Sequence, residues 1–207
     1  MVWAIGNPAQ STALTELIQS QSSDRVVAIV GGAILEDALR EALISRFRSP
    51  EGHRVDLNEK LFRVGGPLGF FMPKVDLAYQ LYVFEKSIRN AMYGIGEIRN
   101  LFAHQLDMKF SSPAQKMIDA INKLSAHEGR THYPLPFGGV EKDSEYKLKA
   151  TETPRDKFFV NLKLCLIWLM GDNMRHGPYN NIPLMWGPIQ QPSLQEIFSE
   201  PNETHQL

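Results

Sequence analysis

Apolar residues recur at intervals of three and four along most of the chain, and the strict alternation that marks strands is nearly absent. The clearest stretch is 23–47, where Val27 and Ile34 lie on one stripe with further apolar residues beside it. Ser23 or Asp24 can cap the start of this stretch, because both side chains accept hydrogen bonds from backbone N–H groups. The pattern therefore predicts a long amphipathic helix.

Four more helices are expected from the same period and from residues that favour helix ends. Proline suits the first turn of a helix because its missing N–H has no intrahelical partner there. Ser112 and Thr153 each precede such a proline and are placed to act as caps. The predicted helices run from Pro73 to about Phe84, from about Ser87 to His104, from Pro113 onward, and from Pro154 to a stop at Gly171.

Three segments lack helical periodicity. Residues 129–152 combine prolines, glycines and charges and are predicted to form an irregular insertion, and residues 173–207 are predicted to form an extended C-terminal arm. The GGPLG sequence at 65–69 is not followed by Gly-Lys-Ser/Thr, so it indicates a turn rather than a phosphate loop. We therefore expect an all-α fold, a helical bundle of five or six helices in a single domain over 1–172, followed by the arm.

Glycines stand inside two of the predicted helices, as the pairs Gly31–Gly32 and Gly94–Gly96. Each glycine in a helix interior costs about 1 kcal/mol relative to alanine, so a compensating interaction is expected. Close approach of another helix, from the same subunit or from a partner, provides it. We therefore expect a homodimer.

Composition limits the classes of function. The chain has 207 residues, 43% hydrophobic and 22% charged, which is typical of a globular domain. Its formal net charge of −1 provides no global attraction for nucleic acid, so weak or no direct DNA binding is expected. Lys116 and Lys123 share a face of their predicted helix, which indicates a solvated surface or, alternatively, a shallow nucleic-acid patch.

The sequence predicts no metal site, no cofactor and no membrane segment. The single cysteine, Cys165, excludes an internal disulfide and lies in an apolar run typical of a buried thiol. The histidines are scattered rather than clustered as metal ligands are. The longest apolar run, 158–170, is too short to span a bilayer, and the N-terminus lacks the pattern of a secretory signal. A cytoplasmic location is expected.

The candidate chemistry lies in EIRNLFAH, residues 97–104, which brings Arg99, Asn100 and His104 together. In a structural interpretation, Arg99 pairs with a carboxylate such as Glu36 or Asp37 between packed helices, and His104 bonds the helix end. In a catalytic interpretation these residues share a site. Positions five apart differ by about 140° around a regular helix, so Arg99 and His104 converge only if the helix ends near residue 103 or if two subunits contribute.

Three segments, DRVVAIVGGAILEDALREALISRF, LFRVGGPLGFFMPKVDLAYQL and IRNLFAHQ, follow one another as in the mannitol operon repressor (MltR-like) family. The resemblance covers about residues 23–125. It implies a helical transcriptional regulator of sugar-alcohol use that lacks a DNA-reading motif and acts through protein–protein contacts. The identity of the protein partner is left open.

The spacing of Arg99 and His104 also resembles the R-x4-H motif of HEPN-domain ribonucleases, which are helical and pair two subunits into one site. That resemblance implies catalytic roles for Arg99, Asn100 and His104, supported by Glu36 or Asp37, in metal-independent cleavage of RNA. Histidine would move the proton and arginine would stabilise the phosphate. A helical interaction module without activity is the third alternative.

Overall fold

The computed structural model describes residues 12–13, 16–17, 22–47, 59–130 and 151–176. For residues 173–176 it describes the backbone alone. Within these residues there is no strand, so the predicted all-α fold is confirmed. The five helices of eight or more residues are α2 (Asp24–Arg46), α4 (Phe71–Gln80), α5 (Lys86–His104), α6 (Gln115–Asn122) and α7 (Pro154–His176). The predicted insertion, apart from its ends, and residues 177–207 of the predicted arm lie outside the described residues.

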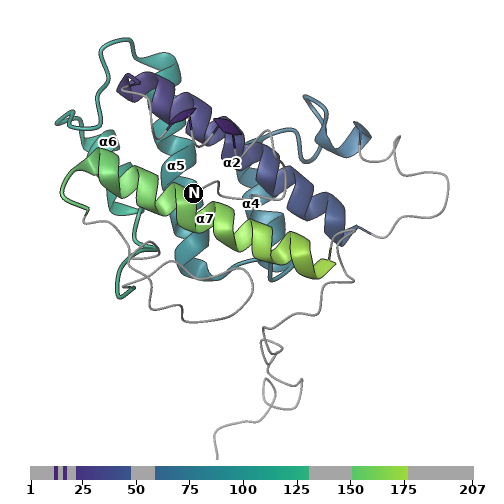
Figure 1. Cartoon of the computed structure of the whole chain (residues 1–207). Helices are drawn as coiled ribbons and strands as arrows, with labels where there is room; N and C mark the ends of the chain where they lie inside the picture. Colours follow the sequence, from purple (N-terminus) through teal and green to yellow (C-terminus); the bar gives the residue numbers. More distant parts are fainter. Residues whose placement is uncertain (1–11, 14–15, 18–21, 48–58, 131–150, 177–207) are drawn as a thin grey trace, which may run out of the picture.

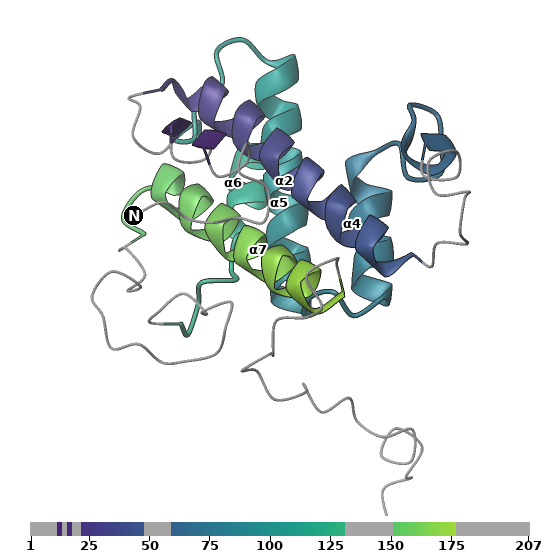
Figure 2. The ribbon, with the colours of Figure 1, turned by 45° about the vertical axis from the view of Figure 1, so that its right-hand side comes forward.

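Helix α5 is the centre of the bundle, because it packs against α2, α4, α6 and α7. Helices α2 and α7 also pack on each other and lie side by side in both ribbon views (Figures 1 and 2). The core between them is formed by apolar side chains on the predicted stripes, of which the largest fully buried ones include Leu35, Leu39, Ile95, Phe102, Phe158 and Leu162. The helical period therefore identified the buried faces correctly.

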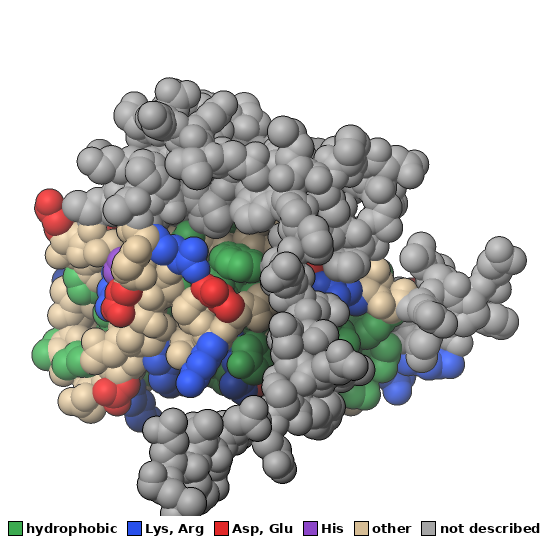
Figure 3. All heavy atoms as spheres, turned by 90° about the horizontal axis from the view of Figure 1, so that it is seen from below, with side chains coloured by type: hydrophobic (Ala, Val, Ile, Leu, Met, Phe, Trp, Pro, Cys, Tyr) green, Lys and Arg blue, Asp and Glu red, His purple; other side chains and the backbone are tan. Residues whose placement is uncertain are grey.

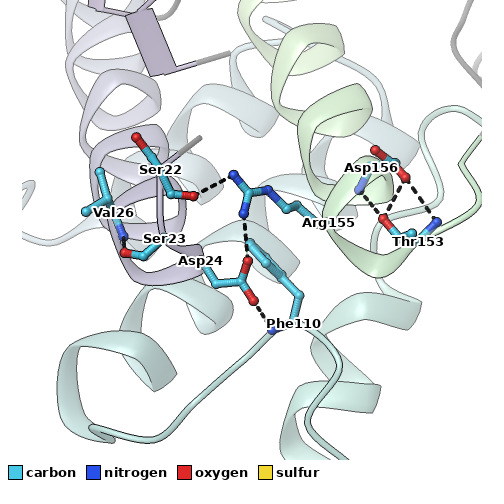
Figure 4. Close-up of polar contacts among 8 residues, drawn as sticks. All are labelled: Ser22, Ser23, Asp24, Val26, Phe110, Thr153, Arg155 and Asp156. Carbon is cyan, nitrogen blue, oxygen red and sulfur yellow. Dashed lines mark hydrogen bonds and ion pairs between the residues drawn. The ribbon is translucent and has the colours of Figure 1, made fainter. Parts of the chain in front are cut away.

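The starts of α2 and α7 follow the predicted capping pattern. The Ser23 hydroxyl accepts the Val26 N–H at 3.4 Å. At α7, the Thr153 hydroxyl accepts the Asp156 N–H at 3.1 Å, and the Asp156 carboxylate accepts the Thr153 N–H at 3.2 Å (Figure 4). This reciprocal pair is a capping box that satisfies two donors at the end of the helix.

Helix α5 ends at His104 as predicted, whereas the starts of α4 and α6 and the end of α7 differ from the predictions. Helix α4 begins at Phe71, so Pro73 is its third residue, where a missing N–H is still tolerated. Helix α6 begins at Gln115 after Ala114, because the Ser112 hydroxyl accepts the Lys109 N–H in a preceding turn and does not cap the helix. Helix α7 continues through Gly171, where an added Cβ would meet no described residue within 4 Å outside its own helix backbone and chain neighbours.

Asp24, the alternative cap of α2, ties three segments together instead (Figure 4). Its carboxylate accepts the Phe110 N–H at 3.1 Å and pairs with Arg155 of α7 at 2.9 Å. Arg155 also donates to the carbonyl of Ser22 at 2.7 Å. The beginnings of α2 and α7 are therefore joined by a polar cluster, with the segment that follows α5 held against both.

Asn161 is a polar residue in the apolar run of α7, and its hydrogen bonds explain why it is tolerated there. Its side chain is fully buried and accepts the Ala126 N–H at 2.9 Å. Its amide donates to the carbonyls of Leu124 at 3.3 Å and Lys157 at 2.8 Å. A buried amide is stable when hydrogen-bonded in this way, and it fixes the segment after α6 on α7.

Helix α4 ends in a Schellman motif with an unusual residue. The N–H of Tyr82 bonds to the carbonyl of Tyr79, and the N–H of Val83 bonds to that of Ala78, both at 3.0 Å. Tyr82 occupies the left-handed position at φ 55°, and it is the one non-glycine residue with positive φ in the described part of the chain. Glycine is usual here because a Cβ costs roughly 1–2 kcal/mol in this conformation.

The glycines inside the helices allow close packing within this chain. A Cβ on Gly32 would lie 2.7 Å from Cδ of Arg99, and one on Gly94 would lie 2.7 Å from the carbonyl oxygen of Ala120. Gly31 and Gly96 are similarly crowded by α7 and α4 side chains. The predicted close approach is confirmed, but intrachain contacts account for it. These glycines therefore no longer argue for the predicted homodimer.

The described residues contain neither a membrane-spanning helix nor a cluster of metal ligands. No described helix is long and apolar enough to cross a membrane, and no group of three potential metal ligands occurs in the described ranges. Cys165 is fully buried, as predicted, and burial raises the pKa of its thiol far above the ordinary value.

Candidate functional site

Helices α2, α4 and α5 meet at a cluster of three charged side chains, which we call the Glu36 cluster: Glu36, Lys74 and Arg99. One oxygen of the Glu36 carboxylate accepts from Nζ of Lys74 and the other from Nη1 of Arg99, each at 2.5 Å. The expected proximity of Arg99 to Glu36 is confirmed. Each of the three helices contributes one charged residue, so the cluster fixes their relative positions.

Lys74 lies in the core because of its place on α4. It shares a stripe with Phe71, Val75 and Ala78, all of which are buried, and only 4% of its own surface is exposed. A buried ammonium requires a counterion, which Glu36 provides. In the sequence, Lys74 is a lysine on an otherwise apolar helical stripe. That pattern could have indicated a buried ion pair, but Lys74 was not predicted as a site residue.

Arg99 approaches Glu36 along the surface of Gly32. The stem of Arg99 fills the space that a side chain at residue 32 would need, and its guanidinium lies 5.7 Å from the centre of the Phe71 ring. Arg99 is thus held by a carboxylate, by an aromatic face and by close backbone packing. About a quarter of its side chain remains exposed to solvent.

The Glu36 carboxylate is stable in its ionised form. Burial alone would raise its pKa, but hydrogen bonds and charge from Lys74 and Arg99 outweigh burial and lower the pKa below its ordinary value. One carboxylate balances two cations, so the cluster as a whole carries one excess positive charge. The arrangement can hold helices together and can present a cation, through Arg99, at the surface.

The other candidate residues are not brought into this cluster within one chain. Asp37, Asn100 and His104 are exposed, and none of their side chains forms an ion pair or hydrogen bond with the described residues. Helix α5 continues regularly to His104, so Arg99 and His104 lie about 140° apart around its axis. Convergence through an early helix end is therefore excluded, which leaves only a site shared between subunits.

The C-terminal end of α5 is capped by Arg25 and not by His104, which the structural interpretation had expected to bond the helix end. From the first turn of α2, its guanidinium donates to the carbonyl of Phe102 and to those of Gln105 and Leu106 at 2.6 and 2.7 Å. These carbonyls lie at the C-terminal end of α5, where no intrahelical donor is available and a cation is favoured. Nothing in the local sequence around residue 25 indicated this contact.

A second arginine of α5 forms a more exposed cluster with α4. Arg89 donates to the carboxylate of Asp76 at 2.6 Å, and the Tyr93 hydroxyl donates to the same oxygen at 2.6 Å. The guanidinium lies 4.8 Å from the ring centre of Tyr79 and 5.3 Å from that of Tyr93. The hydrogen bonds from Tyr93 and Arg89 lower the pKa of Asp76.

The basic residues on α6 and in the segment that follows it do not form a continuous basic patch within the described residues. Lys123 pairs with Glu97 at 2.5 Å, and Arg130 pairs with Glu85. Lys116 is exposed. On the face shown in Figure 3, the acidic and basic side chains of the described residues are interspersed. The solvated-surface interpretation fits these positions better than a nucleic-acid patch.

Comparisons with known proteins give one informative result. The sequence matches no protein-family profile and no curated protein. The fold is similar to a chain in the X-ray structure of the MtlR–HPr complex from Escherichia coli, with a TM-score of 0.55 and 17% sequence identity. The similarity covers 79% of this chain and 99% of that chain. The similarity is one of fold, and the shared helical fold is the one that the sequence resemblance implied.

Proposed function

We propose that this protein is a transcriptional regulator of the mannitol operon repressor type, which acts by binding another protein rather than by reading DNA itself. The observation that carries the proposal is the similarity of its fold to almost the whole of a chain of the MtlR–HPr complex. The three sequence segments that resemble this family lie within that helical fold. HPr is the first partner to test, and a cytoplasmic homodimer is the proposed working state.

The described charges support protein contacts over DNA contacts. Affinity for duplex DNA depends on many Lys and Arg side chains that neutralise phosphates. Here the formal net charge is −1, and several basic side chains, including Lys123 and Arg130, are already paired with carboxylates. Arg99 and Lys74 are both engaged with Glu36 inside the bundle.

The test is calorimetric titration of the purified protein with purified HPr, alongside a titration with duplex DNA from the protein's own operator region. We expect saturable binding of HPr and weak or no binding of DNA at physiological salt. Light scattering on the same sample gives the oligomeric state, and the proposal expects the mass of a dimer. Nanomolar binding of the operator by the protein alone, without HPr binding, would refute it.

The second candidate is a HEPN-like, metal-independent endoribonuclease. It is favoured by the pairing of Arg99 with Glu36, the acidic residue that the motif was expected to need, and by the exposure of His104. Since Arg99 and His104 lie on different sides of α5, this function requires His104 from a second subunit. Incubation with labelled RNA, with and without EDTA, tests it. Cleavage lost in a normally folded His104→Ala variant would establish the enzyme, whereas we expect no cleavage.

A further inference from the structure

Tyr82 occupies the left-handed position of the Schellman motif at the end of α4, and its side-chain contacts do not explain why a tyrosine stands there. It lies at φ 55° where glycine or asparagine is usual, and its side chain is 82% exposed. The ring therefore buries little surface in this chain, although a glycine would relieve the backbone strain. Strained residues of this kind occur preferentially at sites of function.

The surroundings of Tyr82 have the composition of a protein-binding surface. Its N–H bonds to the carbonyl of Tyr79, whose ring lies on Arg89, and Arg89 also contacts the ring of Tyr93. We call these residues, Tyr79, Tyr82, Arg89 and Tyr93, the α4–α5 corner. Tyrosine and arginine contribute most of the binding energy at many protein interfaces. The stacking of Arg89 on the rings of Tyr79 and Tyr93 holds those three side chains in position before a partner arrives.

The other strongly exposed apolar residues do not share this feature. Val64, Phe70 and Leu106 are 93%, 66% and 87% exposed, but none of them has positive φ. Their exposure imposes no comparable backbone strain, and isolated exposed apolar residues are common on protein surfaces. The α4–α5 corner is therefore the strongest of these candidates.

Charge indicates what kind of surface would fit the corner. Arg89 is balanced by Asp76. Lys86, in the first turn of α5 next to the corner, is exposed and forms no ion pair with the described residues. Because the unbalanced charge at the start of α5 is positive, a complementary partner carries a carboxylate at the facing position.

We infer that the α4–α5 corner is the surface that binds the protein partner, with the Tyr82 ring as the central contact and Lys86 facing an acidic group of that partner. This inference rests on the proposed function, since it assigns a surface to the protein contact proposed there. It predicts that the strain at Tyr82 is retained for binding rather than for folding.

The test compares the affinity of HPr for wild type, Tyr82→Gly and Lys86→Glu, together with the melting temperature of each. Val64→Ser and Lys116→Glu are matched controls, which change an exposed apolar residue and an exposed lysine elsewhere. Tyr82→Gly is expected to melt about 2–4 °C higher, because the strain is removed. It should nevertheless bind HPr at least about tenfold more weakly, as should Lys86→Glu. Both controls should bind as wild type does.

The outcomes separate this inference from the proposed function. If wild type binds HPr and Tyr82→Gly binds equally well, the proposed function stands and the docking surface lies elsewhere. If wild type does not bind HPr, the proposed partner is wrong and this assignment falls with it. A change from dimer to monomer in Tyr82→Gly, with HPr binding unchanged, would make a second copy of the chain the occupant and overturn the inference.

Discussion

Helix α5 carries two arginines that look alike and are used differently. Each pairs with a carboxylate from a neighbouring helix and lies over an aromatic ring of α4. Arg99 and Glu36 are joined by Lys74, which is 4% exposed, whereas the Arg89–Asp76 pair is accompanied by the Tyr93 hydroxyl at the surface. The Arg99–Glu36 pair thus fixes three helices relative to one another, whereas the Arg89–Asp76 pair organises side chains at the surface. The difference in burial determines these two roles.

The largest expected effect is that of Glu36→Gln. This change removes the only carboxylate in the Glu36 cluster and leaves Lys74 buried without a counterion. Breaking a buried charged pair on one side costs about 3–5 kcal/mol, so the free energy of unfolding should fall by that amount. Urea denaturation followed by circular dichroism measures it.

Asp37→Asn is the matched control for that experiment, because Asp37 is the adjacent acidic residue and is exposed without an ion pair to the described residues. Its free energy of unfolding should stay within about 0.5 kcal/mol of wild type. If both variants lose the same free energy of unfolding, the ion pairs of the Glu36 cluster do not stabilise the fold more than an exposed carboxylate does.

The second prediction concerns the space that Arg99 occupies. Gly32→Ala would place a Cβ 2.7 Å from Cδ of Arg99, whereas the Cβ of Gly171→Ala would meet no described residue within 4 Å outside its own helix backbone and chain neighbours. Both gain the higher helix propensity of alanine, so their difference isolates the crowding. Gly32→Ala should be less stable than Gly171→Ala by about 1–3 kcal/mol, the usual cost of overpacking. Thermal melts of the two variants provide the comparison, and equal stability would mean that Arg99 moves aside freely.

Sequence reasoning succeeded where one short-range pattern decides the outcome. The helical period gave the buried stripes of α2, α5 and α7, and the capping grammar of Ser23 and Thr153 gave two helix starts. The pairing of Arg99 with an acidic residue of the first long helix was also predicted, with Glu36 and Asp37 as alternatives, and the partner in the structure is Glu36.

The failures at Arg25 and Lys74 arise because contacts distant in sequence outweigh local preference. At Ser112 the competing contact is local instead, because the Ser112 hydroxyl accepts the Lys109 N–H in the preceding turn. Arg25 satisfies carbonyls on a helix that lies far along the chain, and Lys74 becomes buried only once α4 packs on α2. The positive φ of Tyr82 follows from the junction between α4 and α5, where the sequence offers no glycine.

A smaller effect is expected for the exposed arginine. Asp76→Asn removes the charge that Arg89 pairs with, but both side chains are a third or more exposed. Surface ion pairs of this kind contribute about 0–1 kcal/mol, so the free energy of unfolding should change by no more than that. Urea denaturation beside Glu36→Gln measures the contrast directly. A loss as large as that of Glu36→Gln would contradict the division of roles between the two arginines.

The smallest effect is the dependence of stability on pH. Burial raises the pKa of the Glu36 carboxyl, and the hydrogen bonds and charges of Lys74 and Arg99 lower it by more, so the folded-state pKa is below the unfolded one. Such a group stabilises the fold above its unfolded pKa, about 4.3 for glutamate, and this stabilisation is lost as the pH falls through the folded-state pKa. Wild type should therefore lose more free energy of unfolding than Glu36→Gln between about pH 6 and pH 3. Asp37→Asn should follow wild type, and an unchanged slope in Glu36→Gln would show that this carboxylate is not held in its ionised form by the two cations.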